Sequence, residues 1–163
     1  MKKINKTALA PLQEKPDWVG LAARLTVGLT LFISGFLKLL EPAADFAAAI
    51  EAYRILPESL LLPVAQIMPW VELFASGFLL AGYLTRWSAA VCGILSSSFF
   101  LALASTLLRG VKIGECGCFG GAGPHLVAWQ AMIIDAVLIS LAHFIFSRRN
   151  SSFSLDRWIA SGK

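Results

Sequence analysis

The chain has 163 residues, of which 57% are hydrophobic and 15% are charged, and its mean hydropathy is +0.71. A soluble domain carries roughly 45–50% apolar and about 25% charged residues, so this composition excludes an ordinary soluble globular protein. The formal net charge of +4 does not indicate a nucleic-acid partner, because the Lys and Arg residues lie at the ends of apolar runs and in the tails.

Four apolar stretches approach the roughly 20 residues with which an α-helix crosses about 30 Å of hydrocarbon. They comprise residues 18–40, 60–84, 87–108 and 126–146. The predicted fold class is all-α: an integral membrane four-helix bundle. We predict three segments: a cytoplasmic tail at 1–17, a transmembrane domain at 18–147 that includes an outward loop at 112–125, and a cytoplasmic tail at 148–163.

The segment between the first two spans, residues 43–56, places Phe46, Ile50, Tyr53 and Leu56 at steps of three or four residues. Side chains at that spacing share one face of a helix. Because the charged residues of the segment lie elsewhere, we expect a short extracytoplasmic amphipathic helix on the membrane surface. It either caps the bundle or helps to guide a partner.

Basic residues are distributed unevenly between the two sides of the predicted bundle. One side carries Lys2, Lys3, Lys6, Lys15, Arg86, Arg148, Arg149, Arg157 and Lys163, and the other carries Arg54, Arg109 and Lys112, with Lys38 at its border. The positive-inside rule then places both termini in the cytoplasm of a bacterial inner (plasma) membrane protein. Residues 1–17 lack the apolar core of a cleavable signal peptide, so the first span is expected to be an uncleaved anchor.

Two carboxylates, Glu72 and Asp135, fall near the middle of predicted spans. An ionised carboxylate there costs at least about 2.5–3.5 kcal/mol unless it is paired or protonated. We expect Arg24, in the first span, to pair with one of them. The three residues either fix helix packing or form a proton route or a quinone headgroup site. Lys38 lies nearer the outer surface, where its stem can reach water and its charge can lower a thiol pKa in the loop.

The loop at 112–125 is the one polar, glycine-rich segment between two apolar runs, and it contains Cys116 and Cys118. With only Gly117 between them, the two cysteines can form a disulfide only if the chain bends, and such a small ring is strained. Strained, exposed disulfides are labile and oxidising. Because the loop is predicted to face outward, it lies in a compartment where disulfides persist.

The catalytic candidates are therefore Cys116, Cys118 and His125, which predict thiol–disulfide exchange. His125, together with Arg109 and Lys112, would favour a thiolate, and Glu115 would oppose it. A static disulfide or a pair of ordinary thiols are the alternatives. No metal site is predicted, because Cys116, Cys118 and His125 supply one ligand fewer than a closed zinc site needs.

Cys92 lies in the third span, sixteen residues before Leu108 and thus roughly 24 Å from the loop along the helix axis. It cannot resolve a loop disulfide and is expected to be a small apolar residue in a helix interface. The chain then has no second cysteine pair near the first. An external thiol protein or a bound quinone must be the other redox partner.

The sequence resembles the MauE/DoxX family of redox-associated membrane proteins, and more closely its MauE-like branch. The resemblance covers nearly all of the membrane part, and Cys-Gly-Cys-Phe-Gly is its specific block. It rests on Arg24, residues 34–39, Phe46, residues 53–57, residues 69–73, Gly77, Gly82, residues 109–110 and residues 116–120.

This resemblance implies a four-helix membrane protein that supports disulfide formation or electron delivery to extracytoplasmic proteins, often alongside a thioredoxin-like partner. We therefore expect a thiol–disulfide oxidoreductase that acts through Cys116 and Cys118 on a thioredoxin-like or client protein. DoxX relatives associated with quinol oxidation suggest the alternative of a quinone-linked subunit, with Arg24, Glu72 and Asp135 near the headgroup. A non-enzymatic scaffold or assembly factor with a static disulfide is the alternative from another class.

Overall fold

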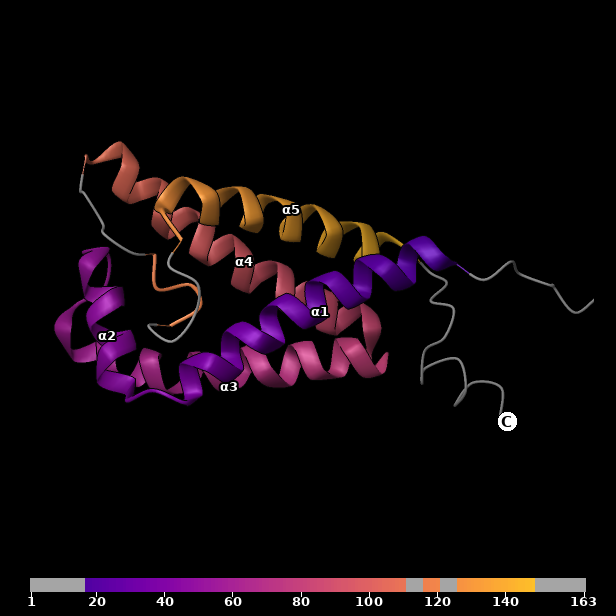
Figure 1. Cartoon of the computed structure of the whole chain (residues 1–163), viewed down its shortest axis with the longest axis horizontal. Helices are drawn as coiled ribbons and strands as arrows, with labels where there is room; N and C mark the ends of the chain where they lie inside the picture. Colours follow the sequence, from indigo (N-terminus) through magenta and orange to yellow (C-terminus); the bar gives the residue numbers. More distant parts are fainter. Residues whose placement is uncertain (1–16, 111–115, 121–125, 149–163) are drawn as a thin grey trace, which may run out of the picture.

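The computed structural model describes residues 17–110, 116–120 and 126–148, and the regular structure within those ranges is helical (Figure 1). The helices are α1 (Trp18–Leu39), α2 (Ala43–Ala52), α3 (Glu58–Ala81), α4 (Thr85–Leu108) and α5 (Ala128–Ser147). All except α2 are long and apolar enough to cross a membrane. The predicted four-helix membrane bundle is confirmed. The predicted site residue His125 and most of the two tails lie outside the described residues.

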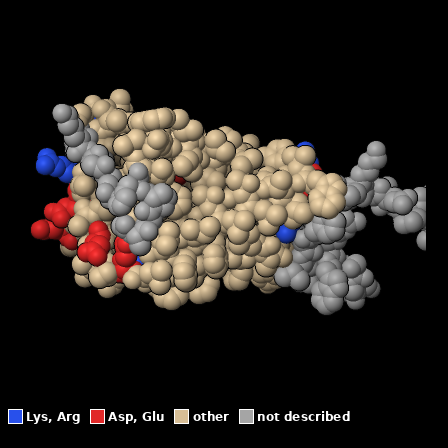
Figure 2. Space-filling model, in the orientation of Figure 1, with Lys and Arg blue, Asp and Glu red and all other residues tan. Residues whose placement is uncertain are grey.

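The bundle is built from two helix pairs: α1 packs along α3, and α4 packs along α5. Large apolar side chains remain exposed along the helices, including Leu29, Phe36, Phe74, Ile94 and Ile133. Figure 2 shows this surface as an uncharged belt, with the charged residues of that face at the two ends. An apolar belt of this extent would be an aggregation surface in water, whereas lipid solvates it. The chain is a multi-pass membrane protein.

Helices α1 and α3 approach each other closely at Gly35. A Cβ atom added there would lie 2.9 Å from the carbonyl oxygen of Pro69 and 3.0 Å from the Cβ of Glu72. Small residues allow helix backbones in membranes to come this near. The contact brings Ser34 and Lys38, on the same face of α1, alongside Glu72 of α3.

Helix α2 packs against α3 and the end of α1, with Phe46, Ile50 and Tyr53 buried as the predicted amphipathic pattern requires. The helix ends at Ala52, before the predicted boundary at residue 56. Its end is explained by Arg54, which adopts a left-handed backbone conformation with φ of 51°. Helix α2 lies at the end of the bundle that also carries the cysteine loop, and we call this end the loop end (Figure 1).

At the opposite end of the bundle, the start of α1 lies close to the end of α5. Arg148, after α5, pairs with Asp17, before α1, at 2.7 Å. The short connection between α3 and α4 lies at this end as well, and Gly82 opens it with a left-handed φ of 71°. Helices α3 and α4 therefore form an antiparallel hairpin.

Candidate functional site

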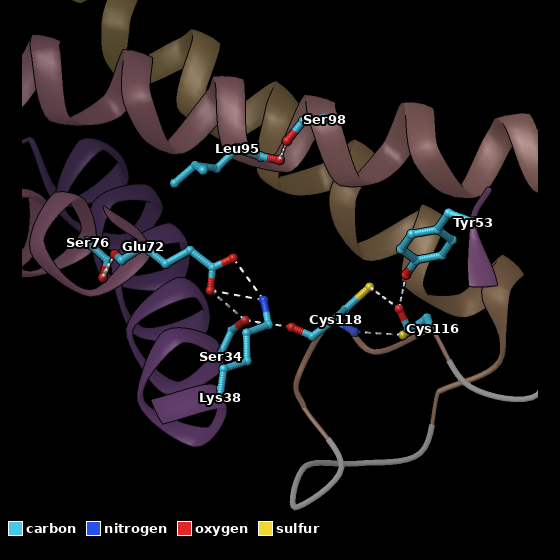
Figure 3. A network of polar contacts seen from close by, with 9 residues as sticks. All are labelled: Ser34, Lys38, Tyr53, Glu72, Ser76, Leu95, Ser98, Cys116 and Cys118. Atoms are coloured by element: carbon cyan, nitrogen blue, oxygen red, sulfur yellow. Dashed lines mark hydrogen bonds and ion pairs between the residues drawn. The ribbon is translucent and has the colours of Figure 1, made fainter. Parts of the chain in front are cut away.

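The segment Cys116–Gly120 folds inward between the helices of the loop end, where side-chain hydrogen bonds from Ser34 and Tyr53 help to hold it (Figure 3). Ser34 of α1 donates its hydroxyl hydrogen to the carbonyl oxygen of Cys118 at 2.7 Å. Tyr53, at the end of α2, donates its hydroxyl hydrogen to the carbonyl oxygen of Cys116. Burial, with the nearby thiols and Asp135 adding to it, raises the pKa of Tyr53, so the phenol stays a neutral donor.

Gly117 makes the turn between the cysteines possible in two ways. Its φ of +62° lies in the left-handed region, where a side chain costs about 1–2 kcal/mol. A Cβ atom at this position would also lie 2.7 Å from the Cβ of Ala49 on α2. The turn therefore rests directly on α2, and any larger residue would push the two apart.

Cys116 and Cys118 are free thiols within this turn. The backbone N–H of Cys118 donates to the sulfur of Cys116 at 3.4 Å, and the Cys118 thiol donates to the Cys116 carbonyl at 3.7 Å. The expectation of an exposed pair is wrong, since the two residues are only 3% and 8% exposed. Both pack into an apolar cluster with Tyr53, Leu103 and Ala131, and burial of apolar surface favours that arrangement.

The two thiols differ in acidity although one residue separates them. The hydrogen bond from the Cys118 side chain, aided by the backbone N–H groups and the Lys38 charge and opposed by burial, lowers the pKa of Cys116 to about 6. The same side-chain hydrogen bond, together with burial and the negative charges of Cys116 and Asp135, raises the pKa of Cys118. Cys116 is therefore the thiolate of the pair, and Cys118 is the thiol that retains its proton.

Lys38 and Glu72 form a buried ion pair beneath the loop. The Nζ of Lys38 lies 2.9 Å and 3.0 Å from the two carboxylate oxygens of Glu72, and both side chains are fully buried. The ammonium group also lies 4.8 Å and 4.3 Å from the ring centroids of Phe46 and Phe99, within the range of a cation–π contact. Lys38 was expected to reach toward the outer surface, but the charge of Glu72 and these rings hold it inside.

The predicted ion pair between Arg24 and Glu72 or Asp135 is wrong. Arg24 donates through Nη2 to the carbonyl oxygen of Leu80 at 3.4 Å. Leu80 lies eight residues beyond Glu72 on α3, which is about 12 Å along the helix axis. The structure therefore places Arg24 toward the end away from the loop, and the three charged residues proposed as one site are not brought together.

Ser34 connects the ion pair to the loop. Its hydroxyl lies 3.2 Å from the Oε2 of Glu72 and 2.7 Å from the carbonyl oxygen of Cys118. A hydroxyl carries one hydrogen, so Ser34 donates to one of these acceptors at a time, and the shorter distance favours Cys118. No sequence pattern identified Ser34 or Tyr53 as contacts of the loop. The available signals were the small residue Gly35 next to Ser34 and the aromatic residue at the end of the amphipathic segment.

Asp135 lies on α5, on the other side of the loop, and lines a small cavity together with Ser34 and Cys118. A larger apolar groove of about 550 Å³ lies between α2, α3 and α4, with Tyr53 and Arg109 at its polar end. Neither Glu72 nor Asp135 lines this groove. Within the ranges given above, no three His, Cys, Asp or Glu side chains are grouped so as to hold a metal ion.

The fold and this site define a multi-pass membrane protein with two inequivalent thiols held in one turn at the end of a four-helix bundle. The family model described as methylamine utilisation protein MauE matches residues 16–148, which is most of the chain. The chain belongs to the MauE family, as its resemblance indicated. No solved structure matches it.

Among curated relatives, the methylamine utilization protein MauE of Paracoccus denitrificans is 31% identical over 121 residues, which are 74% of this chain and 64% of that protein. The MauE proteins of Methylophilus methylotrophus and Paracoccus versutus are 33% and 30% identical. Those matches cover 61% and 69% of this chain, and 52% and 60% of the relatives. The chain thus spans between about half and two thirds of the length of the relatives it matches.

The buried ion pair gives a first prediction. Replacing one partner, as in Lys38→Met, leaves a buried charge unpaired, which typically destabilises a protein by about 3–5 kcal/mol. The double variant Lys38→Met with Glu72→Leu removes both charges and should unfold at a higher temperature than Lys38→Met alone. Thermal unfolding in detergent measures this, with the exposed Asp45→Asn as control. Equal stability of Lys38→Met and the unaltered protein would contradict the role of the pair.

The acidity of Cys116 gives a second prediction. In a Cys92→Ala background, alkylation of Cys116 by iodoacetamide should increase with a midpoint near pH 6 and then level off, because the thiolate is the reactive form. An ordinary thiol would continue to gain reactivity through about pH 8.5. Mass spectrometry locates the modified residue. A midpoint above pH 8 at Cys116 would show that the turn does not stabilise its thiolate.

Proposed function

We propose that this chain is a membrane thiol–disulfide oxidoreductase whose Cys116 and Cys118 exchange disulfides with an extracytoplasmic thiol protein. The observation that carries the proposal is the hydrogen-bonded turn in which the Cys118 amide donates to the Cys116 sulfur and the Cys118 thiol donates to the Cys116 carbonyl. Exchange requires one activated thiol and one resolving thiol within reach of it. The turn supports both roles, because Cys116 is the thiolate and Cys118 is its protonated neighbour.

Because the two thiols differ in acidity, Cys116 and Cys118 take different steps in the two directions of exchange. When the reduced pair attacks a partner disulfide, the Cys116 thiolate forms the mixed disulfide and Cys118 then displaces the partner thiolate. When a client thiolate attacks the closed Cys116–Cys118 disulfide, the more acidic thiol leaves faster. Cys116 is then the leaving group, so the client is held on Cys118. The cysteine that carries the trapped partner therefore reports the direction of electron flow.

A partner reaches the sulfur of Cys116 when the Cys116 end of the turn is drawn outward, while the hydrogen bond from Ser34 keeps Cys118 in place. The contacts of Cys116 with its surroundings include the hydrogen bond from Tyr53 and the one that its own amide donates to the Leu126 carbonyl. A hydrogen bond of this kind contributes about 0.5–1.5 kcal/mol net. Such contacts are weak enough for the docking of a partner to replace them. Burial then protects the thiolate between encounters rather than preventing reaction.

The partner in this proposal is a thioredoxin-like protein or a client on the outer side of a bacterial inner membrane. Support comes from the distribution of basic residues, which favours an orientation with both tails in the cytoplasm and the loop end outside. The relatives' names assign those proteins to methylamine utilisation. We propose that the client of this chain belongs to a pathway of that kind.

A second candidate function, a quinone-linked redox subunit, is favoured by the 550 Å³ groove. Its walls are apolar, as a quinone ring and isoprenoid tail would require, and Tyr53 and Arg109 lie at its polar end. Tyr53 also contacts the Cys116 carbonyl, so the groove and the thiol turn share one side chain. A bound quinone would accept two electrons and two protons as the pair closes to a disulfide.

Substitution of the cysteines tests the exchange proposal against a static scaffold. Cys116→Ser and Cys118→Ser should each abolish catalytic exchange with an oxidised or reduced thiol protein, because one thiol alone cannot complete a cycle. Cys92→Ala should retain it, since Cys92 is buried in the bundle core. Mixed disulfides trapped in the single variants are identified by mass spectrometry. Continued thiol oxidation or reduction in the client pathway after both loop cysteines are replaced would favour the scaffold.

The proposed orientation is tested by labelling in intact cells. In a background without the three native cysteines, Glu51→Cys on the exposed face of α2 should react with an impermeant maleimide. Leu155→Cys, in the C-terminal tail, should react only after the membrane is made permeable. Labelling of position 155 in intact cells would show that the orientation is the reverse of the one proposed.

A further inference from the structure

Asp135 is a buried carboxylate that the ion pair beneath the loop does not use. Its side chain comes from α5, is only 7% exposed, and its Oδ2 makes no hydrogen bond within the ranges that the structure describes. A buried polar atom without a hydrogen-bond partner destabilises the folded protein. A buried carboxylate oxygen without a hydrogen-bond partner, close to two thiols, indicates either a functional role or a water molecule that donates a hydrogen bond to it.

The cavity beside Asp135 is large enough for that water. Its volume is about 20 Å³, whereas one water needs roughly 10–15 Å³ by the same kind of measure. Polar residues from three segments line it: Asp135 from α5, Ser34 from α1, and Cys118 from the loop. A buried water typically makes two to four hydrogen bonds, which these side chains are able to supply. The remaining wall includes the apolar side chains of Leu31, Phe99 and Leu138.

We propose that Asp135 accepts the proton of Cys118 through one water molecule in this cavity when the loop disulfide closes. The proposal rests on the exchange function, because closure is the step in which Cys118 must become a thiolate. Cys118 is the member of the pair that retains its proton, and its burial keeps bulk water from removing it. A neighbouring base reached through a water supplies the missing acceptor.

The step balances in protons and electrons. The thiol proton of Cys118 passes to the water as the water gives a proton to the Asp135 carboxylate, which leaves a Cys118 thiolate and a neutral carboxylic acid. The thiolate attacks the Cys116 sulfur of the mixed disulfide with the partner. The Cys116–Cys118 bond forms, the bond between Cys116 and the partner breaks, and the partner leaves as a thiolate. The loop pair is oxidised and the partner disulfide is reduced.

The other groups that face this site are less suited to the role. Glu72 of α3 is held by Lys38 of α1 in two contacts of 2.9 Å and 3.0 Å, so its negative charge is already compensated. Tyr53 of α2 donates to the Cys116 carbonyl. Cys116 is the sulfur under attack. Asp135 is the carboxylate that lines the cavity with Cys118 and has an oxygen available for a proton.

The test uses the full-length reduced protein in detergent, with Cys92→Ala to leave only the loop thiols, and dithiobis(nitrobenzoate) as the model partner. Attack by Cys116 releases a first thionitrobenzoate and leaves the second on Cys116. Closure by Cys118 releases that second one, and absorbance follows both phases. In Asp135→Asn the first phase should be unchanged and the second about a hundredfold slower, the lower range for loss of a proton acceptor. Asp45→Asn, on the exposed face of α2, is the matched control.

Alkaline pH adds a readout that a structural role would not affect. The slow phase of Asp135→Asn should recover as pH rises, because hydroxide then removes the Cys118 proton, and Asp135→Glu should restore part of the rate. Equal closure rates in the Asp135→Asn and unaltered proteins would overturn the role of Asp135 while leaving exchange intact. Loss of the first phase in Asp135→Asn would also overturn it, by showing that the residue maintains the turn. Absence of a second phase in the unaltered protein would instead overturn the exchange function.

Discussion

Lys38 and Glu72, paired at 2.9 Å between α1 and α3, are the charges around which the loop end is arranged. Neither side chain is stable alone in this apolar interior, so each requires the other, and the close helix approach at Gly35 brings them together. The same pair positions Ser34, which holds the Cys118 carbonyl. It also leaves an ammonium group near the thiols, where its positive charge favours the Cys116 thiolate.

Inequality between two adjacent thiols follows from the direction of the hydrogen bonds in one turn. Because Gly117 allows the chain to bend back, the Cys118 amide donates to the Cys116 sulfur while the Cys118 thiol donates to the Cys116 carbonyl, so the two sulfurs have different surroundings. A symmetric pair would leave the choice of attacking and leaving sulfur undetermined. In the exchange that we propose, the acidity difference links the trapped cysteine to the direction of exchange, and the cavity beside Asp135 is the proposed path for the proton that Cys118 retains.

The difference between lipid and water as surroundings explains why the cysteines are buried between the helices rather than exposed. Along the membrane-spanning helices, lipid solvates the exposed apolar side chains, so no protein segment has to cover them. At the loop end, by contrast, Tyr53, Leu103 and Ala131 would meet water without the cover of Cys116 and Cys118. Covering them buries the sulfurs, and the exchange reaction that we propose then depends on a partner that displaces a few weak contacts.

The sequence by itself determined the four spans, the amphipathic character of α2 and the bend at Gly117, because bilayer thickness, helical periodicity and turn geometry act on local residue patterns. It also identified Glu72 and Asp135 as buried charges that require an explanation. Only the tertiary structure decided that Glu72 pairs with Lys38 rather than Arg24, that the cysteines are buried, and that Asp135 faces a cavity shared with Cys118. Each depends on how far one helix is rotated and shifted against another, which packing at contacts such as Gly35 sets and local sequence patterns do not record.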